Sequence, residues 1–162
     1  MENESVMALY HAIKQLCSDS VNGRGVQEQK WLQNQLSDEN LKTMIPQLSI
    51  IALHILSGLE AEELTGVALA DRLAVTRGGI TRAAKKLIQM GLIQATKKPD
   101  DQKKIYYSLT AKGRVIAQSH DKMHETLKAQ VIDKVTEKYK DAELKQAASL
   151  INDLMQFERD FY

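Results

Sequence analysis

Basic side chains gather in one stretch of the sequence, residues 72–104. This stretch holds nine lysines and arginines against two aspartates, a net charge of +7, whereas the rest of the chain carries −6 and the whole chain only +1. Such segregation is typical of a surface that binds a polyanion such as nucleic acid, through contacts with phosphates and base edges. A charged stretch can also be merely solvated, so the elements that carry these residues decide between the two interpretations.

Two histidines offer a different chemistry. His120 and His124 stand four residues apart in a helical pattern, so both imidazoles can reach one metal ion. Three further residues can complete such a site: His11, Cys17 and Glu28. No CxxC or HExxH motif is present, and paired histidines are more often surface or dimer-contact residues, so we assign no metal site and no cofactor. His54, inside an apolar helix, is interpreted as a hydrogen-bonded core residue.

The single cysteine, Cys17, cannot form an internal disulfide and is a candidate oxidant sensor only if a base or cation activates it. His11 and Lys14 lie on nearby turns, yet a buried structural cysteine is the stronger interpretation. No Ser-His-Asp order, Walker loop, dinucleotide fingerprint or carboxylate pair appears in the sequence. We therefore expect a protein that is not an enzyme.

Helical periodicity predicts the elements that carry the basic residues. Residues 5–21 form one amphipathic stripe, and Pro46 is predicted to open an apolar helix over residues 47–59. After a polar link over residues 60–64, Thr65 caps a short helix, and Thr76 caps a second helix that runs to Met90. Gly91 is its expected stop. Two short helices joined by a tight turn predict a helix-turn-helix.

The pattern then changes to a period of two. Apolar residues alternate with polar ones over residues 93–96 and 104–109, and Pro99 with its polar neighbours supplies a turn. This predicts a lysine-rich β-hairpin, the wing of a winged helix. Helical periodicity returns over residues 110–138 and again over residues 141–161.

This order of elements resembles the MarR-type winged helix-turn-helix transcription regulators over nearly the whole chain. The segment Asp101-Gln102-Lys103, followed by Leu109-Thr110-Ala111-Lys112-Gly113-Arg114, is similar to the family's wing signature. Lys103 stands where the family usually has an arginine. Lysine keeps the charge but loses the planar fork, so we expect phosphate contact there rather than base-edge contact.

The resemblance implies a mainly α fold with a small β-hairpin wing, and N- and C-terminal dimerisation helices. We expect N-terminal dimerisation helices over residues 1–44, the DNA-binding domain over residues 45–110 and C-terminal dimerisation helices over residues 111–162. The resemblance also implies a ligand-responsive repressor that binds a pseudo-palindromic site in double-stranded DNA as a homodimer. In one zinc-responsive branch of the family, a histidine pair on the helix that carries His120 and His124 binds the metal. Other members sense oxidants through a cysteine in the first helix, where this chain has Cys17, and others bind small phenolic ligands.

The helix after Thr76 is then expected to enter the major groove. Its outward residues are Arg77, Gly78, Thr81, Arg82 and Lys85. The arginines suit paired hydrogen bonds to guanine. The wing residues expected to contact phosphates are Lys97, Lys98, Lys103 and Lys104.

The longest nearly apolar run, residues 48–56, is nine residues, too short to cross a bilayer, and the first residues do not resemble a secretory signal. We expect a cytoplasmic protein without a membrane partner. Three alternatives stay open: a metal- or oxidant-sensing regulator of the same fold, a winged-helix protein-interaction module without DNA, and a monomer whose terminal helices fold back on their own core.

Overall fold

The structure is a computed structural model that describes residues 3–22 and 24–161. The chain divides into two units, Met1–Met123 and His124–Tyr162. In chain order the elements are α1 (Glu4–Asn22), α2 (Arg24–Gln35), α3 (Glu39–Met44), the 3-10 turn η1 (Ile45–Gln47), α4 (Ile50–Gly58), β1 (Leu64–Thr65), α5 (Gly66–Leu73), α6 (Arg77–Gln89), β2 (Ile93–Lys98), β3 (Asp101–Leu109), α7 (Ala111–Lys138) and α8 (Asp141–Phe161). The predicted fold, mainly α with a small β wing, is confirmed.

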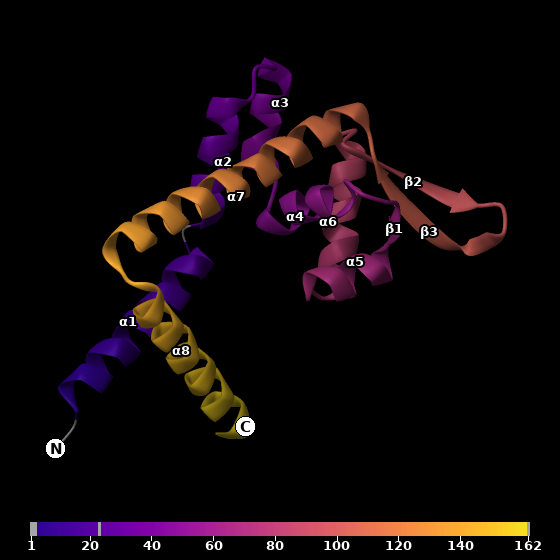
Figure 1. Cartoon of the computed structure of the whole chain (residues 1–162). Coiled ribbons are helices and arrows are strands. Elements are labelled where there is room, and N and C mark those ends of the chain that lie inside the picture. Colours follow the sequence, from indigo (N-terminus) through magenta and orange to yellow (C-terminus); the bar gives the residue numbers. More distant parts are fainter. Residues whose placement is uncertain (1–2, 23, 162) are drawn as a thin grey trace. The chain divides into compact units, whose positions relative to one another are not determined.

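Leucines and isoleucines from successive helices build the core of the first unit, where α4, α5 and α6 lie together beside the base of the wing (Figure 1). The fully buried side chains include Leu32, Ile45, Leu53, Ile55, Leu56, Leu69, Ile80, Leu87, Leu92 and Ile116. Each stabilises the fold by about 1.5–3 kcal/mol relative to an exposed position. Helix α6 turns Ile80, Ala84 and Leu87 inward. Ile88, the residue after Leu87, is 40% exposed.

The helix-turn-helix consists of α5 and α6. Thr65 and Thr76 cap these helices as predicted, each accepting the backbone N–H three residues ahead. Between the helices Ala74 adopts a left-handed conformation, with φ 52° and ψ 42°, which costs a non-glycine residue about 1–2 kcal/mol. The N–H of Val75 bonds to the carbonyl of Ala70 at 3.1 Å, so the turn between the helices is fixed by the backbone.

Helix α4 begins later than the sequence pattern predicts. Pro46 lies inside η1, and α4 starts only at Ile50. The side chain of Ser49 accepts the N–H of Ala52 and supplies the N-cap. The proline therefore opens a 3-10 turn, and the serine opens the helix.

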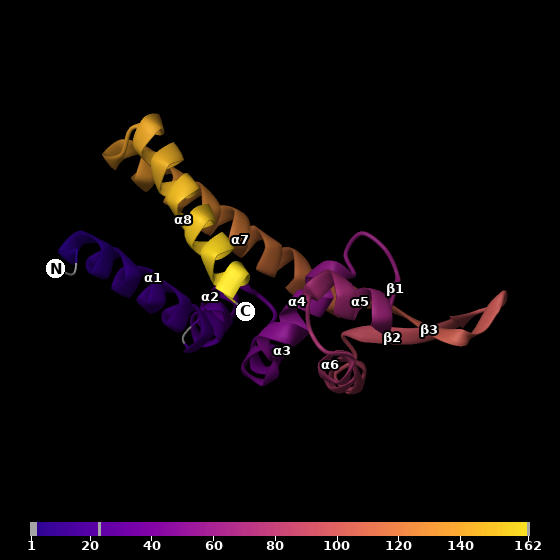
Figure 2. The ribbon, with the colours of Figure 1, turned by 90° about the horizontal axis from the view of Figure 1, so that it is seen from below.

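The wing is a three-stranded antiparallel sheet in the order β1-β3-β2. Strands β2 and β3 form the predicted hairpin, with Ile93 opposite Leu109 at its base, and Figure 2 shows it extending away from the helices. Strand β1 was not expected, because residues 60–64 read as a polar link. Leu64 nevertheless pairs with Tyr107, so the chain segment before α5 is joined to the wing.

Hydrogen bonds of the segment Leu109-Thr110-Ala111-Lys112-Gly113 connect the start of α7 to the residues that follow α6. Thr110 Oγ1 donates to the carbonyl of Gly91 at 2.8 Å and accepts the N–H of Gly113 at 3.1 Å. Gly113 is buried, and a Cβ there would overlap the carbonyl of Leu92. Close backbone approach therefore requires glycine at this position.

The second unit consists of the C-terminal part of α7 and α8, and no described residue of α8 is buried. Large apolar side chains at its surface include Leu127, Val131, Ile132, Leu150, Ile151, Met155, Phe157 and Phe161. Despite these apolar residues, none of the helices within residues 3–22 and 24–161 has the length and hydropathy needed to cross a membrane.

We predict that Gly113→Ala lowers the free energy of unfolding by about 1–3 kcal/mol, because the added methyl group overlaps the Leu92 carbonyl and α7 must shift. Urea unfolding followed by circular dichroism measures this change. Gly78→Ala is the matched control: no atom lies within 4 Å of its added Cβ, so it should match wild type or gain up to about 1 kcal/mol. Equal stability of Gly113→Ala and wild type would contradict the packing described above.

Candidate nucleic-acid interface and metal-ligand cluster

Helix α6 presents the predicted contact residues on its outer face. All five are exposed: Arg77, Gly78, Thr81, Arg82 and Lys85. The Thr81 hydroxyl donates to the carbonyl of Arg77 at 2.9 Å, so toward a ligand it acts as an acceptor. Gly78 leaves open space above the first turn, since no atom lies within 4 Å of where a Cβ would stand. The outer face is therefore basic and sterically open.

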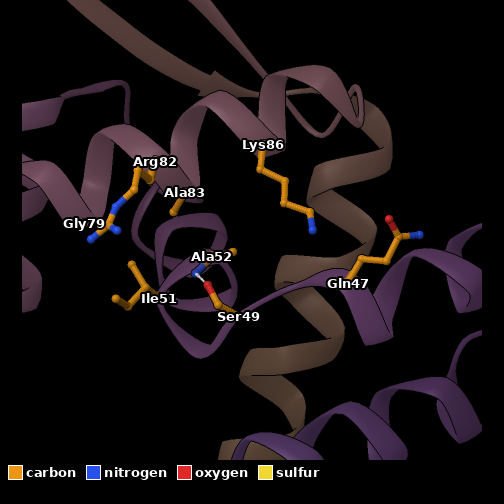
Figure 3. Close-up of a pocket in the computed structure, with 8 residues that line it drawn as sticks. All are labelled: Gln47, Ser49, Ile51, Ala52, Gly79, Arg82, Ala83 and Lys86. Atoms are coloured by element: carbon orange, nitrogen blue, oxygen red, sulfur yellow. Dashed lines mark hydrogen bonds between the residues drawn. The ribbon is translucent and has the colours of Figure 1, made fainter.

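A groove of about 310 Å³ lies between α6 and the start of α4. Figure 3 shows its lining residues, Gln47, Ser49, Ile51, Ala52, Gly79, Arg82, Ala83 and Lys86. Lys86 reaches from α6 toward the segment that carries Gln47, one turn after Arg82 (Figure 3). Lys86 was not among the predicted contact residues. Its spacing of four from Arg82 is the signal that places both cations along one groove.

Two of the four wing lysines form ion pairs within the chain, and two do not in the part that the structure describes. Lys97, Lys98, Lys103 and Lys104 are all exposed. Lys98 Nζ lies 3.7 Å from Glu63 Oε2 and 4.2 Å from the centre of the Tyr106 ring. Within residues 3–22 and 24–161, no ion pair involves Lys97 or Lys103. These two ammonium groups are the ones available to a phosphate.

Asp101 orders the tip of the wing. Its Oδ1 accepts the backbone N–H groups of Lys103 and Lys104 at 3.3 Å, and its Oδ2 lies 3.0 Å from the Lys104 ammonium. The hydrogen bond from Lys104 lowers the pKa of the Asp101 carboxyl, and the same bond raises the pKa of Lys104. Asp101 therefore holds the turn and Lys104, while the side chain of Lys103 projects without an ionic partner in the described chain.

A second cluster joins three helices of the first unit. Glu28 of α2, His54 of α4 and His120 of α7 offer ligand atoms that lie within 4.8 Å of one another. His120 is only 1% exposed, and its Nε2 lies 3.5 Å from Glu28 Oε2. That carboxylate oxygen is buried and has no hydrogen-bond partner among the described residues. The His54 ring stands edge-on to the His120 ring, with the centroids 5.5 Å apart.

The other nitrogen of His120 belongs to a hydrogen-bonded network. Ser57 Oγ lies 2.8 Å from His120 Nδ1 and donates to Asp121 Oδ1 at 2.6 Å. Burial raises the pKa of the adjacent Glu60, and its hydrogen bond with Asp121 raises that pKa further. Polar groups thus surround His120 on the side of α4.

The sequence pointed to only part of this cluster. It paired His120 with His124, which follows four residues later on α7 and is exposed. It named Glu28 only as one of several possible partners, and it assigned His54 to the core, whereas His54 is half-buried and faces His120. The side chain of Cys17, interpreted as a buried structural cysteine with oxidant sensing as the alternative, lies outside the described residues.

Comparisons with known proteins match the winged-helix part of the chain. A model of the winged helix DNA-binding domain matches residues 46–113. The regulator YvnA of Bacillus subtilis, described as an uncharacterized HTH-type transcriptional regulator, is 34% identical over 83 residues, 51% of this chain and 53% of YvnA. The transcriptional regulator AdcR of Streptococcus pneumoniae is 40% identical over 67 residues, 41% of this chain and 46% of AdcR. The chain thus spans about half the length of these relatives.

Among solved structures, ZitR of Lactococcus lactis, described as a zinc-responsive MarR family member, matches with a TM-score of 0.62 and 28% identity, over 67% of this chain and 75% of ZitR. ZitR in complex with DNA matches with a TM-score of 0.60 and 26% identity, over 67% of this chain and 74% of ZitR. The domain match and these structures agree with the elements described above. Residues 46–113 therefore form a winged helix domain, and the chain is similar in fold to a MarR family member.

Proposed function

We propose that the chain is a transcription regulator, acting as a ligand-responsive repressor, that binds double-stranded DNA through α6 and the wing. The observation that carries this proposal is the exposed basic face of a helix whose opposite face is buried in the core. A capped helix with a rigid base can enter the major groove and present its first turns to base edges. The similarity to the transcriptional regulators AdcR and YvnA, and to ZitR in complex with DNA, supports the same function.

In this proposal Arg77 and Arg82 read bases, and Lys86 with the wing lysines contacts phosphates. Arginine forms paired hydrogen bonds to guanine O6 and N7, whereas a lysine ammonium acts as a point charge. Gln47 and Ser49 line the same groove as Lys86 and suit hydrogen bonds to the sugar-phosphate backbone.

The proposed partner besides DNA is a second copy of the chain. The apolar side chains that α7 and α8 expose in the second unit are more than scattered surface residues and suit an interface. A homodimer places two α6 helices on half-sites one helical turn apart, so the proposed operator is pseudo-palindromic. We propose residues 1–44 and 111–162 as dimerisation helices and residues 45–110 as the DNA-binding domain.

Metal response is the second part of the proposal. It is favoured by Glu28 Oε2, which is buried beside His120 and has no hydrogen-bond partner in the part of the chain that the structure describes. One carboxylate and two imidazoles are ligands that zinc accepts. Each Zn–N bond is about 2.0–2.1 Å long, so the ligand atoms around a tetrahedral zinc ion lie about 3.3 Å apart. The ligand atoms of Glu28, His54 and His120 lie within 4.8 Å of one another, so these side chains must move slightly closer together to bind zinc. A bound zinc ion would join three helices of the first unit.

We predict that Arg82→Ala and Lys103→Ala weaken DNA binding differently. Arg82→Ala should cost about 1–3 kcal/mol on the preferred site and relax base preference, whereas Lys103→Ala should weaken all sequences alike and reduce the salt slope by about one. Fluorescence anisotropy on specific and random duplexes over a salt series measures both. Lys145→Ala, an exposed lysine of α8, is the control and should bind as wild type does. Equal losses on both duplexes for both variants would refute this division of roles.

We predict that Ile151→Glu converts the dimer to a monomer, because an ionised carboxylate cannot be buried in an apolar interface without a large cost. Light scattering should give twice the chain mass for wild type and the mass of one chain for the variant. Asn152→Glu adds the same charge at the next exposed position and should remain dimeric. A wild-type mass of one chain would rule out the dimer.

We predict that zinc changes the DNA affinity of the wild-type protein by about 5- to 150-fold, the usual range of coupling between two sites. His54→Ala and Glu28→Gln should remove this difference, because each deletes a proposed ligand. Anisotropy titrations in zinc and in a chelator measure it, with His11→Ala as a histidine control outside the cluster. Identical wild-type affinity in both conditions would contradict the metal response.

A further inference from the structure

We propose that Ser57 and Asp121 are positioning residues that hold the His120 ring with Nδ1–H toward Ser57, leaving the Nε2 lone pair toward Glu28 and His54. The inference rests on the proposed metal response and adds residues that neither the family resemblance nor the comparisons assign. It also links two elements through the ring, since Ser57 lies on α4 and the other two residues lie on α7.

The direction of the hydrogen bonds follows from counting protons. A serine hydroxyl has one proton, and the 2.6 Å bond gives it to Asp121 Oδ1, because a carboxylate only accepts. Ser57 Oγ must therefore accept in its 2.8 Å contact with His120 Nδ1. That contact requires a proton on Nδ1, so a neutral His120 carries its lone pair on Nε2.

The surroundings of Nε2 suit a cation that His120 would share with Glu28. Nε2 lies 3.5 Å from Glu28 Oε2, a buried oxygen without a hydrogen-bond partner among the described residues. Two lone pairs that face each other in a buried place are stabilised by a cation that both can ligate. With the opposite tautomer, Nε2–H would point at Glu28 and block coordination. The network around Ser57 thus prepares the ring for a metal before one binds.

The position of Ser57 gives the network a mechanical role as well. Ser57 stands in the last turn of α4, and the carbonyl of the next residue, Gly58, accepts a hydrogen bond from Arg72 of α5 at 3.2 Å. Just beyond the end of α4, the Glu60 carbonyl accepts one from Arg114 of α7 at 3.2 Å. The other end of α4 lines the groove beside α6. A ring held between Ser57 and a metal therefore fixes the helix that supports the DNA-contacting helix.

The test compares the ring tautomer and the metal affinity in the full chain. Long-range proton–nitrogen spectra of histidine-labelled protein at pH 8, where an ordinary imidazole is neutral, report which nitrogen carries the proton. We expect Nδ1–H for His120 in wild type without metal, and a shift toward Nε2–H in Ser57→Ala. His120→Gln identifies which signal belongs to His120. Ser57→Thr, which keeps a hydroxyl at this position, should show the Nδ1–H tautomer as wild type does.

Competition with a chromophoric chelator measures zinc affinity in the same variants. Ser57→Ala and Asp121→Asn should bind zinc about 10- to 100-fold more weakly, and Ser57→Thr should recover most of that loss. Ser119→Ala, which changes the residue next to His120 outside the network, should bind zinc as wild type does.

The outcomes separate this inference from the proposed function. If wild type binds zinc but Ser57→Ala keeps both the tautomer and the affinity, the positioning role is overturned and the metal site stands. If wild type binds no zinc, the metal response fails, while the tautomer comparison still decides the role of Ser57. An Nε2–H tautomer of His120 in the wild-type protein overturns the inference in either case.

Discussion

Burial of the inner face of α6 is the constraint on which the rest of the structure depends. Ile80, Ala84 and Leu87 pack into the core formed with α4 and α5, and this packing fixes the rotation of the helix about its axis. Only the opposite face, with its arginines and lysines, is then left to solvent. The N-cap at Thr76 fixes the start of this helix, and the hydrogen bond from Thr110 to the Gly91 carbonyl fixes the chain just after its end.

Charge placement follows from this packing. The whole chain carries a net charge of +1, yet residues 72–104 carry +7, and they form the end of α5, α6, most of the wing and the connections between them. A chain that is basic in one region and acidic elsewhere can hold DNA at that region while the remainder disfavours non-specific binding. The proposed function therefore depends on the distribution of charge rather than on its sum.

Local features could be predicted from the sequence, and contacts between distant segments could not. The caps at Thr65 and Thr76 and the hairpin are set by neighbouring residues, so their spacing reveals them. Strand β1 escaped prediction because its two residues are defined only by pairing with β3. The Glu28, His54 and His120 cluster escaped for the same reason, since its members come from three helices and only their packing brings them together.

Selection of bound sequences from a random duplex pool tests whether the chain binds a symmetric DNA site and whether zinc changes that binding. When the selection is performed with the full chain, once in zinc and once in a chelator, it measures DNA binding, the symmetry of the bound site and the response to metal together. We expect enrichment of a pseudo-palindromic site whose half-sites lie one helical turn apart, and we expect the enrichment to differ between zinc and chelator. A bound pool indistinguishable from the input in both conditions would contradict this expectation.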